Sequence, residues 1–90
     1  MSVRYTVRIQ RNVERKIWEM PEIAQKTLLK LIDDIRESGP IQSKYHNFST
    51  LGKDLYYCHL AYKWVAVWRC KKGSCYVEVE YVGSREKAPY

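Results

Sequence analysis

The sequence has no long apolar run, and no stretch approaches the ~18 residues that a membrane span needs. The first residues, Met1 to Tyr5, hold no apolar signal core, so we expect neither membrane insertion nor a secretory leader. Glycine and proline are also few, at 4 and 3 of 90 residues, whereas 46% of the residues are hydrophobic. This composition argues against a disordered chain and predicts one small globular domain over residues 1–90.

Cysteine is scarce, and the three that are present, Cys58, Cys70 and Cys75, are an odd number. Their spacing fits no small disulfide framework and contains no CxxC pair. A zinc site that adds His46 or His59 to these thiols therefore has no support from spacing. We expect reduced thiols, a cytoplasmic location and no metal or other cofactor.

Acidic residues are outnumbered by basic ones, 10 against 16, and the formal net charge is +6. The chain also has 8 Tyr and 3 Trp, many for its length. Protein surfaces that bind nucleic acid combine cations with exposed aromatic rings. An anionic partner is expected, and charge alone leaves RNA, DNA and an acidic protein segment open.

The first half of the chain predicts one strand and two helices. Apolar and polar residues alternate over Val3–Ile9, the period of a half-buried strand. Asn12 is a candidate cap for a helix that runs to Met20, and Pro21 fits the first turn of a second helix. An apolar face recurs along that second helix, which the Ser-Gly-Pro string at 38–40 ends.

The second half predicts three strands after a polar, irregular stretch at Ile41–Lys53. The strands are Leu55–Leu60, Trp64–Cys70 and Cys75–Tyr81. Their links are too short for crossovers, so the three strands should pair as antiparallel hairpins. The expected fold is a small α+β domain in the order β-α-α-β-β-β, with a twisted, mainly antiparallel sheet and both helices on one face.

The last nine residues, Val82–Tyr90, place Arg85, Lys87 and Tyr90 just beyond the last predicted strand. A guanidinium group can fork onto phosphate oxygens, and a phenol can stack on a base or move a proton. This pattern suits a phosphodiester site at the open end of a sheet. The competing interpretation is a solvated basic tail.

Three segments of the sequence together resemble the RelE/ParE superfamily of type II toxin–antitoxin toxins: Leu55–Leu60, Trp64–Trp68 and Val82–Glu86. The resemblance implies a compact sheet with two helices and a concave basic face that meets RNA. RelE-type members cut messenger RNA in the ribosomal A site without metal, whereas ParE-type members poison DNA gyrase. In both branches an antitoxin segment wraps the toxin and neutralises it.

The resemblance also implies candidate catalytic residues. Metal-free RNA cleavage needs a group that takes the 2′-OH proton, cations around the phosphorane and a proton donor for the leaving oxygen. Arg85 matches the last arginine of RelE within a shared Val-Gly-x-Arg-Glu string, and Tyr90 falls near the catalytic tyrosine. His59 stands where RelE has a strand lysine, and histidine is the commonest general acid or base near neutral pH.

The sequence departs from RelE at Tyr57 and Val65, where the resemblance leads one to expect a lysine and an arginine. Other cations are therefore candidates to contact RNA or its phosphates: Lys44, Lys53, Lys63, Arg69 and Lys87.

The expected function is that of an mRNA interferase, an endoribonuclease that inhibits translation. The alternatives are a ParE-like gyrase inhibitor and a non-catalytic RNA- or protein-binding module on the same fold. The expected partners are mRNA on the ribosome and a cognate antitoxin with an acidic, partly helical segment. The toxin itself is expected as a monomer or within an antitoxin-mediated hetero-oligomer.

Overall fold

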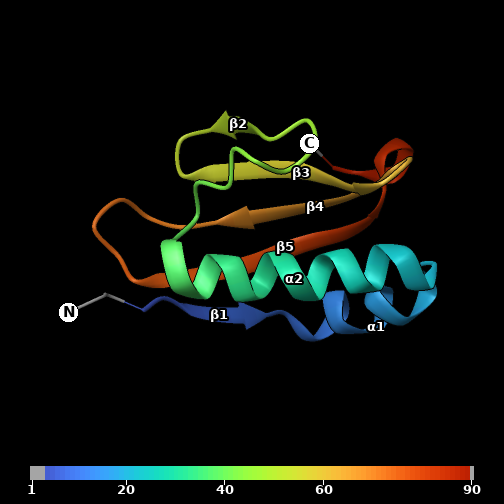
Figure 1. The fold of residues 1–90 in the computed structure, drawn as a ribbon, viewed down its shortest axis with the longest axis horizontal. Helices are drawn as coiled ribbons and strands as arrows, with labels where there is room; N and C mark the ends of the chain where they lie inside the picture. The colour runs from blue at the N-terminus through green and yellow to red at the C-terminus, as the bar shows by residue number, and fades with distance from the viewer. Residues whose placement is uncertain (1–3, 90) are drawn as a thin grey trace.

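The computed structural model describes residues 4–89, which form a five-stranded sheet with two helices (Figure 1). The elements in chain order are β1 (Thr6–Ile9), α1 (Arg11–Glu19), α2 (Glu22–Ser38), β2 (Ser49–Gly52), β3 (Leu55–Ala61), β4 (Trp64–Arg69), β5 (Tyr76–Ser84) and the short 3-10 helix η1 (Arg85–Lys87). The strand order is β1-β5-β4-β3-β2, with β1 parallel to β5 and every other pair antiparallel. The predicted α+β class and mainly antiparallel sheet are confirmed.

Both helices cover the same face of the sheet, as predicted (Figure 1). The apolar faces of α1 and α2 share one core with side chains from β3, β4 and β5. Trp68 of β4 is fully buried at its centre, and its indole N–H donates to the carbonyl of Pro40 at 2.9 Å. This bond ties the chain after α2 onto the sheet. Among residues 4–89, neither helix is long and apolar enough to cross a membrane.

Gly39 ends α2, as the sequence predicted. Its φ of +94° is a backbone conformation that suits glycine, and its N–H donates to the Ile35 carbonyl at 2.8 Å. A Cβ at this position would lie 2.9 Å from the ring of Tyr5. The helix therefore stops where both backbone geometry and space require glycine.

The predicted starts of α1 and α2 were both wrong by one or two residues. The N-cap of α1 is Gln10, and Asn12 lies inside the helix. The Gln10 side chain donates to Glu78 of β5 at 2.9 Å, so a contact with the sheet sets where the first turn begins. Pro21 is the N-cap of α2, one position before the predicted first turn.

The stretch Ile41–Lys53 is not wholly irregular, because Ser49–Gly52 forms the edge strand β2. All of its residues are exposed, so it has no apolar period that the sequence could show. Its backbone pairing with β3 makes it a strand. Strand β5 also runs to Ser84, beyond the predicted end at Tyr81, and this extension brings Arg85 to the end of the sheet.

Candidate functional site

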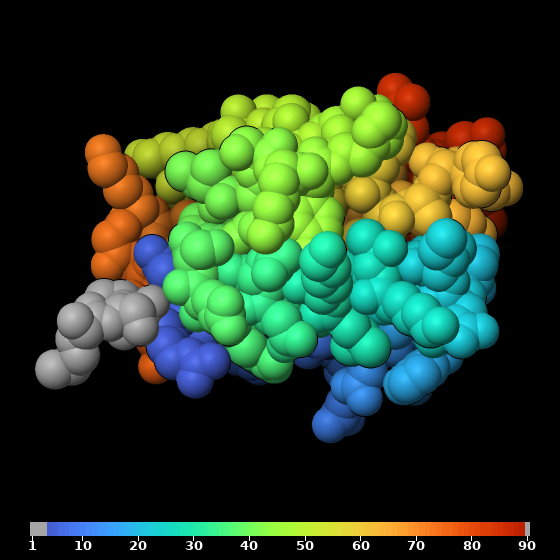
Figure 2. Space-filling model, viewed as in Figure 1, coloured from blue at the N-terminus to red at the C-terminus, as the bar shows by residue number. Residues whose placement is uncertain are grey.

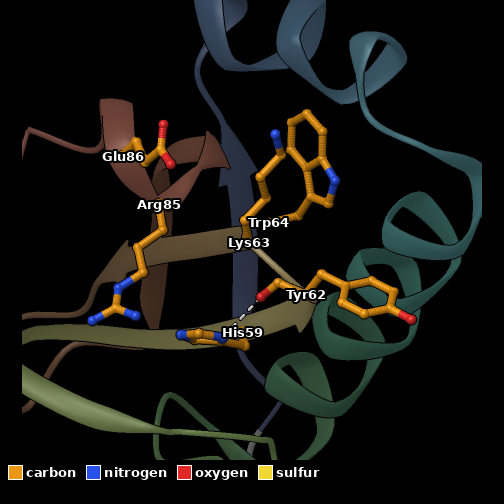
Figure 3. Close-up of a pocket in the computed structure, with 6 residues that line it drawn as sticks. All are labelled: His59, Tyr62, Lys63, Trp64, Arg85 and Glu86. Atoms are coloured by element: carbon orange, nitrogen blue, oxygen red, sulfur yellow. Dashed lines mark hydrogen bonds between the residues drawn. The ribbon is translucent and has the colours of Figure 1, made fainter.

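The β3–β4 turn and the start of η1 border an open hollow of about 770 Å³ (Figure 3). It is lined by His59, Tyr62, Lys63, Trp64, Arg85 and Glu86. Two residues of the predicted catalytic set, His59 and Arg85, therefore lie together although 26 positions separate their numbers in the chain. Of the predicted phosphate-binding cations, Lys63 lines the same hollow.

A backbone hydrogen bond holds the two walls of the hollow together. The Arg85 N–H donates to the Lys63 carbonyl at 2.6 Å, which fastens the end of β5 to the β3–β4 turn. In the space-filling view this turn and the C-terminal segment lie side by side at one edge of the molecule (Figure 2). The hollow thus rests on strand ends that the sheet itself positions.

His59 is held by hydrogen bonds on both ring nitrogens. Its Nδ1 lies 3.1 Å from the Tyr62 carbonyl oxygen, and its Nε2 lies 2.6 Å from the Tyr57 hydroxyl. A carbonyl oxygen only accepts, so Nδ1 carries the hydrogen and donates it. In the neutral ring, Nε2 then holds the lone pair and accepts from the Tyr57 O–H. The Tyr62 carbonyl thus orients the ring, and the Tyr57 hydroxyl is an acidic group in contact with the nitrogen that can act as a base.

Tyr57 is the site residue that sequence reasoning did not identify as functional. Tyr57 and His59 alternate along β3, and side chains two apart on a strand point to the same face. That period was the signal that could have paired them. The resemblance to RelE marks Tyr57 only as the loss of an expected lysine.

Gly83 and Tyr81 shape the strand end that presents Arg85. The Tyr81 hydroxyl donates to the Ser84 carbonyl at 2.6 Å. To reach it, the phenol passes so close to Gly83 that a Cβ there would lie 2.8 Å from the Tyr81 oxygen. The glycine of the Val-Gly-x-Arg-Glu string therefore makes room for the tyrosine that braces the backbone before Arg85.

The position that resembles the second RelE cation is apolar and closed. Val65 is fully buried, so no cation reaches the hollow from it. Arg85 is exposed and also borders a smaller hollow of about 290 Å³ on the sheet, with Leu51, Tyr57, Val67 and Ala88. The guanidinium group thus stands between the His59 hollow and an apolar recess.

The remaining predicted phosphate contacts are spread over the molecule. Lys87 lines a neighbouring hollow of about 340 Å³ that also contains Lys16 and Lys63. Lys44 follows α2 and pairs with Asp34 at 3.3 Å, Arg69 pairs with Glu80 at 2.8 Å, and Lys53 lies in the turn between β2 and β3. None of these three lines the His59 hollow among the residues described. Tyr90 lies outside the described residues.

A second histidine stands beside the first. The ring of His46 meets that of His59 edge-on, with centroids 5.7 Å apart, and the His59 backbone N–H donates to the His46 carbonyl at 2.9 Å. His46 is exposed. Within residues 4–89, no three His, Cys, Asp or Glu side chains gather as a potential metal site.

No protein-family model matches the sequence, and no curated protein is significantly similar to it. The fold, however, is that of RelE toxins. A chain of the archaeal RelE–RelB complex from Pyrococcus horikoshii OT3 matches with a TM-score of 0.72 at 16% identity, over 93% of this chain and 98% of that chain. The isolated E. coli RelE toxin matches with a TM-score of 0.71 at 18% identity, over 94% and 88%. The RelBE2 toxin–antitoxin complex of Mycobacterium tuberculosis gives 0.64 at 15% identity, over 92% and 100%.

Proposed function

We propose that this protein is the toxin of a type II toxin–antitoxin pair and cleaves mRNA on the ribosome. One observation carries the proposal: on a RelE fold, His59 is hydrogen-bonded to Tyr57 and lines a hollow with Arg85 and Lys63, and Arg85 borders a second hollow with Tyr57. A base with its acidic partner and two cations supply proton removal and charge stabilisation, two of the three functions that metal-free phosphodiester transesterification requires.

The first step removes the proton of the ribose 2′-OH. The 2′-oxygen attacks the adjacent phosphorus while its proton passes to the Tyr57 oxygen and the Tyr57 proton passes to His59 Nε2. His59 becomes an imidazolium, which the Tyr62 carbonyl stabilises through the Nδ1–H bond. The backbone thus holds the ring in the tautomer that can act as a base.

The second requirement is stabilisation of the charge that develops on the phosphorane. Arg85 offers a forked donor that matches two phosphate oxygens, and Lys63 adds a flexible point charge from the facing turn. Both are exposed before the substrate arrives. Glu86 lines the same hollow and limits how much positive charge gathers there.

The reaction ends when the bond from phosphorus to the 5′-oxygen breaks. The products are a 2′,3′-cyclic phosphate and a 5′-OH, and the departing oxygen takes one proton. We assign Tyr90, from its place in the sequence, to orient the RNA or supply this proton, and a water is the other available donor.

The test is cleavage of mRNA on programmed ribosomes in the presence of EDTA. We expect Arg85→Ala to slow cleavage by ~10²–10³, since it removes a donor used mainly in the transition state. His59→Ala should cost on the order of 10²–10⁴, and Tyr57→Phe about 10², because both interrupt proton transfer. Lys72→Ala, in the exposed β4–β5 turn, is the control and should cleave like the wild type.

If the folded variants cleave as fast as the wild type, the assignment of these residues is wrong. If the wild type does not cleave mRNA, the proposed endoribonuclease function is wrong. The protein is then a non-catalytic binding module or a gyrase inhibitor. The observation that favours these alternatives is the apolar, buried Val65 at a position where the resemblance leads one to expect a cation. A supercoiling assay with purified gyrase separates the two.

We also propose that an antitoxin covers exposed apolar side chains on the helices. Trp18, Ile23 and Leu29 are 73%, 61% and 61% exposed, on α1 and α2. The +6 charge suits an acidic segment that becomes ordered on contact. Co-purification with the small protein encoded beside the toxin gene should yield a complex that Trp18→Ser weakens. Absence of any stable complex from the native operon would contradict the proposal.

A further inference from the structure

Tyr62 has a conformation and an exposure that the fold does not account for. It occupies the first position of the two-residue β3–β4 turn with a φ of +43°, in the left-handed region that non-glycine residues seldom adopt. Its side chain is 94% exposed, the highest fraction among the large hydrophobic residues of the described chain. Glycine or asparagine would suit this turn better. Backbone outliers of this kind gather at functional sites.

The turn that carries Tyr62 is part of the His59 site. The Tyr62 carbonyl accepts from His59 Nδ1, so the same residue orients the base and projects the ring. Figure 3 shows the Tyr62 ring and the Arg85 side chain on opposite sides of His59, along one hollow. A strand that places a phosphate at Arg85 and passes His59 therefore meets the Tyr62 ring next.

The Tyr62 ring is the aromatic face that remains open in this hollow. Lys63 Nζ already lies over the neighbouring Trp64 ring, 5.8 Å from its centroid. Within residues 4–89, no ring or cation packs against Tyr62. Open aromatic faces next to cations are what proteins use to hold single-stranded nucleic acid, because every base has a face that stacks.

We propose that Tyr62 stacks on an unpaired base of single-stranded RNA next to the phosphate that Arg85 holds. This inference rests on the proposed function and specifies its substrate: RNA whose base beside the scissile phosphate is unpaired. Stacking accepts all four bases, so Tyr62 contributes affinity for the unpaired state rather than for a sequence. A base inside a duplex cannot present its face to the ring.

The experiment uses short single-stranded RNAs with 2′-O-methyl groups, which cannot undergo 2′-OH attack, and 2-aminopurine at each position in turn. Anisotropy reports affinity, and quenching of 2-aminopurine reports stacking. Tyr62→Asn suits the backbone and keeps the carbonyl that orients His59, so it removes only the ring. We expect it to weaken binding by ~5–150-fold and abolish quenching at one position. Tyr62→Trp should retain both.

Tyr76→Ala is the matched control, because Tyr76 is 72% exposed and lines a separate hollow with Arg8 and Lys71. It should bind like the wild type. Equal binding by wild type and Tyr62→Asn, an equal loss in Tyr76→Ala, or no RNA binding by the wild type would overturn the inference. Normal RNA binding by Tyr62→Asn together with lost antitoxin binding would make Tyr62 a protein contact instead. Quenching by a wild type that does not cleave ribosomal mRNA would refute the proposed catalysis and leave the inference standing.

Discussion

At the scale of single residues, we predict that Tyr62 lowers the stability of the fold while its ring serves RNA binding. Its left-handed backbone costs about 1–2 kcal/mol for an ordinary side chain. Asparagine tolerates this region, so Tyr62→Asn should raise the free energy of unfolding by ~0.5–1 kcal/mol in urea denaturation. Tyr76→Asn, on a strand, should be neutral or destabilising. A loss of stability in Tyr62→Asn would mean that the ring supports the fold.

At the scale of elements, two glycines with positive φ allow the cost of backbone strain to be measured apart from the cost of a steric clash. Gly39 at the end of α2 has φ +94° and faces Tyr5, whereas Gly73 in the β4–β5 turn has φ +86° and no atom within 4 Å of the place that a Cβ would occupy. Gly73→Ala should cost about 1–2 kcal/mol from strain alone. Gly39→Ala should cost ~1–3 kcal/mol more, because the methyl group collides with the ring.

The measurement is urea unfolding of both variants, followed by Gly39→Ala in a Tyr5→Ala background. The additional cost should disappear when the ring is absent, which a double-mutant cycle detects. Equal costs for the two alanine variants would show that Tyr5 moves away without penalty.

A second element-scale prediction concerns the contact between α2 and the loop that follows it. The Tyr45 hydroxyl donates to Asp34 at 2.5 Å, and Lys44 pairs with the same carboxylate at 3.3 Å. The Tyr45 hydrogen bond, and then Lys44, hold the pKa of Asp34 below its usual value, although partial burial opposes them. A carboxylate with a lowered folded-state pKa stabilises the fold above its unfolded pKa, and this stabilisation is lost as pH falls through the folded pKa.

Tyr45→Phe removes the main cause of this lowered pKa. It should reduce the free energy of unfolding at pH 7 by about 1.5–3 kcal/mol, the usual range for a hydrogen bond to a charged group. The difference from wild type should shrink as the pH falls and Asp34 takes up a proton. Urea unfolding at pH 7 and pH 2.5 measures it, and a gap that is constant between the two would assign the loss to packing of the ring.

At the scale of the whole molecule, the three cysteines report on the integrity of the core. Cys58 is fully buried in the core between helices and sheet, and desolvation raises the pKa of its thiol to about 12. Burial also raises the pKa of Cys70, whereas Cys75 is exposed. Since the thiolate is the reactive form, a thiol reagent at pH 8 should label Cys75 rapidly in the native protein.

Cys58 and Cys70 should react only at the rate of unfolding. The control is Cys75→Ser, which should show no rapid labelling until urea is added. Rapid reaction of Cys58 in the native protein would mean that the core opens locally. This labelling also provides the test of folding that every site variant above requires.

Local patterns in the sequence determined the elements of this protein and their order. The alternation over Val3–Ile9, of which Thr6–Ile9 forms β1, and the short links between the last three strands depend on neighbours in the chain. Gly39 ends α2 for a reason that the Ser-Gly-Pro string already shows. The exposed strand β2 escaped prediction because it buries no side chain, and its state depends on hydrogen bonds to β3.

Only the tertiary structure decided which polar groups meet. The sequence could not rank the candidate phosphate contacts among themselves, but the end of β5 brings Arg85 to Lys63 while Arg69 pairs with Glu80. Spacing along β3 places Tyr57 and His59 on one face, but the hydrogen bond between them depends on rotamers that no spacing specifies. The exposure of Tyr62 and its positive φ are properties of the folded two-residue turn that no pattern in the sequence predicts. Sequence patterns report local preference, whereas a site is made by long-range pairing that places distant residues side by side.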